Sequence, residues 1–249
     1  MDDMADTQIE KDVAGVAAAA AEAAARVLRA AIAARGRATW LLAGGSAPMA
    51  AYRILAAEYQ ARVDWQRVYV AIGDERCVPA DSPDANWLQV SDALLNVVDV
   101  PDSNRLRPAI ASSPEIMAEQ YATLLATLPQ TANAVPHFDL AWLGLGEDGH
   151  TLSLFPGRDS QAQNQSLVVA VHDSPKPPPD RVSLTLRAVQ GIENGFILAT
   201  GPTKSTSVSR ALQGDTVLPI VQVVNTIEQA GGHVTWLLDP EVSVQASST

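Results

Sequence analysis

His150 lies in the segment "GEDGHT" (146–151), two residues after Asp148 and directly behind the apolar run "FDLAWL". A histidine with a near-neutral pKa can take a proton from water, and a neighbouring carboxylate can orient the ring and stabilise its charged form. A histidine after a strand is also as often a structural residue as a general base. The spacing alone therefore leaves both interpretations open.

The same segment matches a dinucleotide-binding pattern, because the glycines between 144 and 149 satisfy G-x-G-x-x-G. Asp173 even stands near the distance of about 20 residues at which such sites place an acid. That pattern, however, needs a helix directly after the third glycine, and "FPG" at 155–157 ends any such helix after about two turns. The two acidic residues inside the loop would also repel a pyrophosphate. We therefore favour a loop that presents His150.

Two further segments carry groups that suit an anionic ligand. In "GGSAP" (44–48), the N–H groups of Gly44 and Gly45 and the Ser46 hydroxyl stand at a helix start, where they can form an oxyanion or phosphate nest. In "GDER" (73–76), Asp74 and Arg76 follow another strand, and Arg76 can grip a phosphate with two N–H groups. Taken singly, a tight turn and a surface ion pair are the commoner explanations.

Lys176 lies in the proline-rich segment "SPKPPPD" (174–180). Prolines stiffen the backbone, so we expect a rigid loop that holds Lys176 over a site rather than a linker between domains.

Apolar runs that alternate with helical patterns must position these loops. Strands are predicted at 38–43, 67–72, 137–143, 166–171, 181–186, 195–200 and 233–238, and helices at 8–35, 49–59, 86–98, 114–128, within 201–212 and from 219. This alternation predicts an α/β fold with a mostly parallel sheet that is covered by helices on both faces. Ligands bind beyond the carboxyl ends of such strands, so the polar loops should converge on one crevice.

Composition sets further bounds. The chain has 249 residues, 47% of them hydrophobic, which is enough for one large core and a single domain over 1–249. The net charge of −11 argues against nucleic acid and anionic membranes as partners. The single cysteine fits a reducing compartment, and the acidic start of the chain is unlike a signal peptide, so the cytoplasm is the expected location.

Several tempting residues are expected to carry no chemistry. Three histidines lack metal-ligand spacing and are expected to be packing or surface groups: His137, His172 and His233. Cys77 is expected to be buried filler. Arg181 and Lys204 are weaker candidates for binding a phosphate, and a surface charge is the commoner explanation for each. Asn86 and Trp87 either line the site or anchor a loop, and we favour anchoring.

Together these segments resemble the 6-phosphogluconolactonase family. The resemblance extends from about residue 40 to 205 and rests on "LLAGGSAPMAAYRIL", "IGDERCVPADSPDANW", "FDLAWLGLGEDGHTLSLFPG", "SPKPPPDRVSLTL" and "GPTKS". The combination of "GEDGHTLSLFPG" with "GDER" is far more specific than either alone. The chain departs from the family's motifs at two positions: Ala47, where the family often has threonine, and Leu152, where alanine is commoner. Neither change removes a titratable group.

The resemblance implies a Rossmann-like fold shared with glucosamine-6-phosphate deaminase and ribose-5-phosphate isomerase. It also implies hydrolysis of 6-phospho-D-glucono-1,5-lactone to 6-phospho-D-gluconate in the oxidative pentose phosphate pathway, without metal or other cofactor. By motif, His150 is the expected general base with Asp148 beside it. The residues expected to bind the substrate are Gly44, Gly45, Ser46, Asp74, Arg76 and Lys176. Arg76 is also a candidate for stabilising the oxyanion.

Two other functions remain open on the sequence. A glucosamine-6-phosphate deaminase has an "MDEY"-like segment in place of "IGDER" and "DGHIAFNEP" in place of "DGHTLSLFPG", so both departures favour the lactonase. A non-catalytic sugar-phosphate-binding regulator usually carries a DNA-binding module, and this chain offers no basic helix-turn-helix. We expect a small-molecule substrate and a monomer or weak homodimer.

Overall fold

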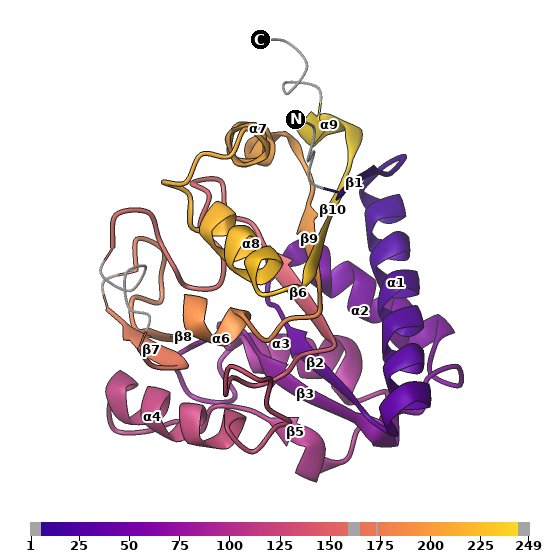
Figure 1. Ribbon diagram of the computed structural model, residues 1–249, viewed down its shortest axis with the longest axis vertical. Helices are drawn as coiled ribbons and strands as arrows, with labels where there is room; N and C mark the ends of the chain where they lie inside the picture. Colours follow the sequence, from indigo (N-terminus) through magenta and orange to yellow (C-terminus); the bar gives the residue numbers. More distant parts are fainter. Residues whose placement is uncertain (1–5, 159–164, 173, 244–249) are drawn as a thin grey trace.

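The main sheet of the protein has seven parallel strands in the order β1-β10-β9-β6-β2-β3-β5 (Figure 1). The computed structural model describes residues 6–158, 165–172 and 174–243. The strands are β1 (Asp6–Ile9), β2 (Ala38–Leu42), β3 (Val68–Ile72), β5 (Arg105–Leu106), β6 (Leu140–Gly144), β9 (Asn194–Ala199) and β10 (His233–Leu238). The central strands are almost continuously apolar because both of their faces are covered.

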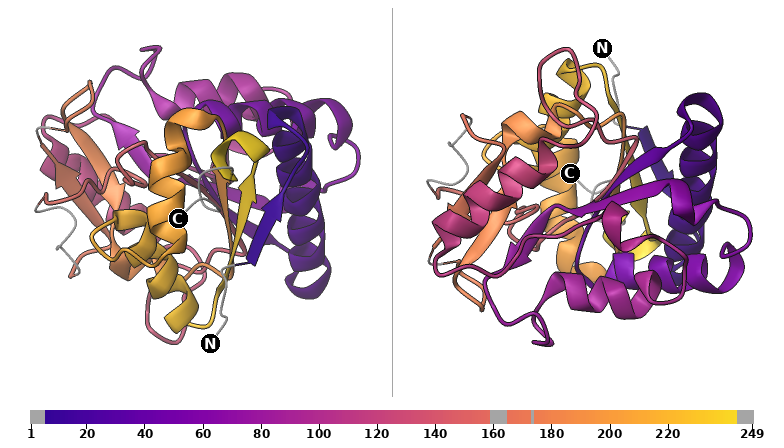
Figure 2. Two further views of the ribbon diagram at one scale, coloured as in Figure 1. Left: turned by 90° about the horizontal axis from the view of Figure 1, so that it is seen from above. Right: turned by 90° about the horizontal axis from the view of Figure 1, so that it is seen from below.

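Helices cover both faces of this sheet, as the two views of Figure 2 show. The long helix α1 (Val13–Arg35) and α2 (Ser46–Glu58) lie on one face, and α8 (Pro219–Gln229) lies on the other. The Asp12 side chain caps the start of α1 by accepting from the Gly15 N–H, and Gly36 ends the helix with φ of 75°. The predicted α/β fold with a mostly parallel sheet is confirmed.

A second, antiparallel sheet departs from the prediction. Its strands are β4 (Asp74–Arg76), β8 (Arg181–Leu184) and β7 (Val168–Val171), and α4 (Pro114–Leu125) packs against it. The segments 166–171 and 181–186 were expected in the parallel sheet, and that expectation is wrong. Fewer than a dozen residues join them, which is too short for a parallel crossover. β4 falls within the polar segment that was expected to be loop throughout.

Smaller elements also differ from the predicted pattern. The predicted helix 8–35 begins only at Val13, because the exposed residues before it form the edge strand β1. The predicted helix 86–98 is a short α3 (Asn86–Val90) that continues as a π-helical turn (Ser91–Leu95). Short α-helices in the described ranges are α6 (Leu186–Val189), α7 (Ser205–Leu212) and α9 (Pro240–Ser243), and 3-10 turns lie at Trp65–Arg67, Asp102–Asn104 and Pro202–Lys204. Within the described ranges, no helix is long and apolar enough to cross a membrane.

Candidate active site

The polar loops meet in a cavity of about 350 Å³ at the carboxyl ends of β2, β6 and β9, next to the antiparallel sheet. All six residues expected to bind the substrate line this cavity: Gly44, Gly45, Ser46, Asp74, Arg76 and Lys176. His150 lines it as well, and Asp148 contacts His150 from behind. The convergence expected from a parallel sheet is thus present in the structure.

His150 is held in place by Asp148. The Nδ1 atom of His150 lies 2.5 Å from Oδ1 of Asp148, which also accepts from the His150 main-chain N–H at 3.2 Å. The imidazole packs against the ring of Phe155, with 4.6 Å between the centroids. Since Asp148 occupies Nδ1, Nε2 is the ring nitrogen left for the cavity.

The electrostatics of this pair favour a charged imidazole during proton transfer. Partial burial alone would raise the pKa of Asp148, but the hydrogen bond and the charge of His150 outweigh it and lower that pKa to about 2. An ionised Asp148 stabilises the imidazolium that forms when His150 takes a proton. The pair can therefore work as an oriented general base.

Two glycines of the G-x-G-x-x-G segment (144–149) leave room for the His150 ring and allow the turn before it. A Cβ on Gly146 would lie 1.9 Å from Nδ1 of His150, and Gly149 has φ of 84°, a conformation that suits glycine. No helix begins between residues 150 and 158, so the element that a dinucleotide site requires does not follow this loop. Asp173 lies outside the described residues.

Two arginines stand opposite each other across the antiparallel sheet. Arg76 on β4 pairs in register with Arg181 on β8, so both side chains share the face that lines the cavity. Arg76 donates to the main-chain oxygen of Asp84, and Arg181 donates to loop carbonyls. Among the described residues, neither guanidinium has a carboxylate within ion-pair distance. Two such cations side by side suit an anionic ligand.

Two lysines add to this positive charge. Lys176 and Lys204 both line the cavity, and burial together with the charge of Lys176 lowers the pKa of Lys204. Arg181 and Lys204 were expected at the surface, but Arg181 is only 3% exposed and both face the cavity. The alternation in "RVSL" was the available signal, since it puts Arg181 and Ser183 on one face of β8.

A buried carboxylate fixes the loop between β4 and α3. Glu75 points away from the cavity and accepts from the main-chain N–H groups of Arg76, Asn86 and Trp87, each at 2.7 Å. Burial raises the pKa of Glu75 to about 7 against these three hydrogen bonds. Asn86 both anchors the loop and lines the cavity. Its Nδ2 donates to the main-chain oxygen of Asp74, and its Oδ1 lies next to Gly44 with no hydrogen-bond partner in the described part of the chain.

Two buried tyrosines hold the strand ends that lead into the site. The hydroxyl of Tyr52 on α2 donates to the main-chain oxygen of Ala43 and accepts from its N–H, just before Gly44. The hydroxyl of Tyr121 on α4 does the same at Ile72, just before "GDER". Burial raises the pKa of both hydroxyls, so they stay protonated and able to donate. Sequence reasoning did not identify either tyrosine.

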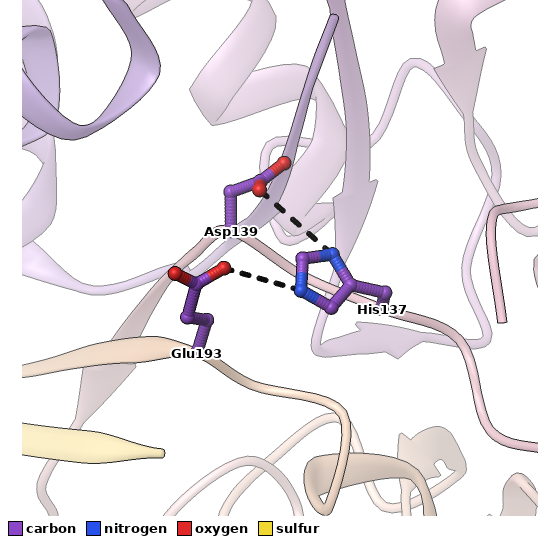
Figure 3. A group of neighbouring side chains, drawn as sticks. All are labelled: His137, Asp139 and Glu193. Carbon is purple, nitrogen blue, oxygen red and sulfur yellow. Dashed lines mark ion pairs between the residues drawn. The ribbon is translucent and has the colours of Figure 1, made fainter. Parts of the chain in front are cut away.

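A cluster at the other end of the sheet has metal-ligand residue types. Ligand atoms of His137, Asp139 and Glu193 lie within 4.8 Å of one another (Figure 3). The guanidinium of Arg35 already contacts both carboxylates, and Asp139 also accepts two hydrogen bonds from Thr39. The arginine supplies the positive charge that a metal ion would bring. We therefore assign these residues to the stability of the fold.

The other residues set aside on sequence have ordinary surroundings. His172 and His233 are half exposed or more and contact carboxylates at the surface. Cys77 was expected to be buried but is half-buried, with its Sγ 3.6 Å from Sδ of Met117.

Known proteins resemble this chain over nearly its whole length. Residues 11–236 match the family described as glucosamine-6-phosphate isomerases/6-phosphogluconolactonase. The 6-phosphogluconolactonase of Mycobacterium tuberculosis is 37% identical over 93% of this chain and 94% of its own length. The corresponding protein of Streptomyces coelicolor is 36% identical over 86% of this chain and 84% of its own length.

Solved structures agree with the fold. The 6-phosphogluconolactonase of Trypanosoma brucei superposes with a TM-score of 0.82 at 29% identity and covers 98% of this chain, which covers 99% of that one. A monomeric glucosamine-6-phosphate deaminase has a TM-score of 0.79 at 20% identity over 96% of this chain and 98% of its own, a likeness of fold alone. The chain belongs to the glucosamine-6-phosphate isomerase/6-phosphogluconolactonase family.

Proposed function

We propose that this protein is a 6-phosphogluconolactonase, which hydrolyses 6-phospho-D-glucono-1,5-lactone to 6-phospho-D-gluconate in the oxidative pentose phosphate pathway. The observation that carries the proposal is the aspartate-held His150 at a cavity with four cationic side chains. A phosphorylated lactone needs both features: a base for its ester carbonyl and positive charge for its phosphate. The lactonase names of these curated relatives support the same activity.

His150 acts at the lactone carbonyl. Its Nε2 takes a proton from a water molecule while the water oxygen forms a bond to C1, which gives a tetrahedral oxyanion. The bond between C1 and the ring oxygen then breaks, and the ring oxygen leaves with the proton that His150 returns. Asp148 keeps Nδ1 engaged throughout and stabilises the imidazolium between the two transfers.

The phosphate arm lies among the cations. Lys176 lies in the proline-rich loop and Lys204 ends the 3-10 turn before α7, and Ser46 with the N–H groups of the Gly44–Gly45 turn adds neutral donors at the start of α2. Arg76 lies on β4, held by the main-chain oxygen of Asp84, and serves either the phosphate or the oxyanion. Loss of a phosphate contact raises KM, whereas loss of an oxyanion contact lowers kcat, so kinetics of Arg76→Lys separate the two roles.

Other expectations stay predictions. They are a reaction without metal or other cofactor, a cytoplasmic location, a monomer or weak homodimer, and one functional domain over residues 1–249.

The first experiment is hydrolysis of freshly generated 6-phosphogluconolactone, measured by proton release and corrected for spontaneous hydrolysis. Wild type should accelerate the reaction, and His150→Asn should lose about 10²–10⁴-fold in kcat while its affinity for 6-phosphogluconate persists. His233→Asn is the matched control, since His233 also contacts an aspartate, at 3.1 Å, but lies at the amino end of β10.

Each other outcome is informative. Near-normal turnover by His150→Asn would remove the general base from the mechanism. An inactive wild type would overturn the lactonase proposal, and glucosamine 6-phosphate would be the next substrate to assay.

A further inference from the structure

Arg181 is a buried cation in contact with the loop that carries Lys176. The side chain is 3% exposed in the whole molecule. Its Nε donates to the main-chain oxygen of Pro178 at 3.0 Å, and one terminal nitrogen donates to the oxygens of Lys176 and Pro177 at 2.8 and 3.3 Å. One guanidinium thus binds three successive carbonyl groups.

The main chain of Lys176 is held by Arg181 and by Ser174. The Ser174 hydroxyl donates to the Lys176 oxygen at 2.8 Å and accepts from its N–H at 3.2 Å. Lys176 itself is exposed, and its ammonium has no ion pair among the described residues. The backbone therefore determines where the ammonium can reach.

The surroundings of Arg181 explain why an arginine is needed. Its planar fork donates from two fixed nitrogens to three carbonyl groups, whereas a lysine ammonium carries its three donors on one nitrogen and cannot reproduce that arrangement. The guanidinium also lies over the ring of Phe155 at 5.6 Å, and the same ring packs against His150. Arg181 and His150 therefore pack against the same side chain, Phe155.

We propose that Arg181 is a positioning residue for substrate binding, which places Lys176 at the phosphate end of the cavity. The inference rests on the proposed function, since it takes a phosphorylated sugar as the ligand. Arg181 then affects the affinity for the phosphate through Lys176, and His150 carries out the chemical step.

A double-mutant cycle tests this assignment. Arg181→Lys keeps the charge but loses most of the carbonyl contacts, and Lys176→Met removes the ammonium. We expect each single variant to raise KM for the lactone and Kd for 6-phosphogluconate about tenfold, with kcat changed less than about threefold. The double variant should bind no more weakly than Lys176→Met alone, because Arg181 acts through Lys176.

Controls separate positioning from a general loss of structure. Arg105→Lys is the matched control, because Arg105 also binds two main-chain carbonyl groups, of Val100 and Leu95, at a site outside the cavity. It should leave KM and Kd unchanged. Gluconate, which lacks the phosphate, should bind Arg181→Lys and wild type equally. Arg181→Gln serves as a second variant if the lysine variant does not fold.

Several results would overturn the inference. Additive losses in the double variant would mean that Arg181 acts independently of Lys176. A fall in kcat at constant KM would place Arg181 in the chemical step. The calorimetric Kd for 6-phosphogluconate requires no turnover, so an inactive wild type that still shows the coupled loss of affinity would reject the lactonase activity and retain the role of Arg181.

Discussion

The ionised form of Asp148 serves both the general base and the stability of the fold. Its pKa falls from 3.8 to about 2 in the folded protein, so the carboxylate stabilises the fold above its unfolded pKa, and this contribution disappears as pH falls through about 2. The side chain is 38% exposed, and after discounting for solvent screening we expect about 1 kcal/mol.

The prediction is a pH-dependent difference between wild type and Asp148→Asn. In urea unfolding, the free energy of unfolding of the variant should lie about 1 kcal/mol below that of wild type at pH 6, and the gap should narrow below about pH 4. A gap that stays constant down to pH 2.5 would show that the charge of Asp148 is not what stabilises the loop.

The residues of the site differ in how visible they are in the sequence. His150 and Asp148 stand two apart in one loop, so their contact could be predicted from spacing. Arg181 meets Arg76 only through the register of two antiparallel strands that are more than a hundred residues apart. Spacing along the chain carries no information about such a pair, and an arginine taken alone is expected at the surface.

At the scale of elements, helices α2 and α4 act on the site through one hydroxyl each. Tyr121 is 1% exposed and satisfies both the N–H and the oxygen of Ile72, at 2.8 and 2.7 Å. Without the hydroxyl, two buried main-chain groups lose their partner next to "GDER".

We therefore expect Tyr121→Phe to lower the free energy of unfolding by about 1–3 kcal/mol and to raise KM, because the strand end that carries Asp74 and Arg76 becomes less well placed. Thermal unfolding and steady-state kinetics test this. Tyr69→Phe is a suitable control, since Tyr69 on β3 has no hydroxyl contact among the described residues. Equal effects of the two substitutions would show that the Ile72 contacts do not matter.

The elements were predictable where one pattern dominates. The mostly apolar runs of β2, β6 and β10 predict buried parallel strands, and Gly36 predicts the end of α1. β4 has only three residues, all charged, and exists because it pairs with β8. A strand stabilised by its partner rather than by its own sequence cannot be read from periodicity.

At the scale of the whole molecule, the two ends of the main sheet have different tasks. The cavity lies at the carboxyl ends of the strands, where it is lined by an oriented histidine and by four cations that make no ion pair among the described residues. The amino ends carry the cluster of Figure 3. Arg35, the last residue of α1, contacts Asp139 and Glu193 of this cluster, which directly precede β6 and β9. At the amino ends of the strands the charged side chains form ion pairs with one another, whereas the cations at the carboxyl ends face the cavity.

Because the cluster and the cavity lie at opposite ends of the sheet, we predict that Asp139→Asn destabilises the protein and leaves its catalytic constants unchanged. Asp139 is 3% exposed, contacts Arg35 and accepts two hydrogen bonds from Thr39, so the substitution removes a buried, hydrogen-bonded charge and leaves the half-exposed Arg35 with Glu193 as its acidic partner among the described residues. We expect a loss of about 1–3 kcal/mol, or about 2–12 °C in Tm, with kcat and KM within about twofold of wild type at 25 °C.

Asp102→Asn supplies the comparison, because Asp102 also contacts an arginine, at 3.6 Å, but its side chain is 98% exposed. Water screens such a pair, and its loss should change stability by less than about 0.5 kcal/mol. The two variants remove the same charge and differ in burial. A fall in kcat in Asp139→Asn, measured well below its Tm, would mean that the amino ends of the strands communicate with the cavity and that the two tasks are not separate.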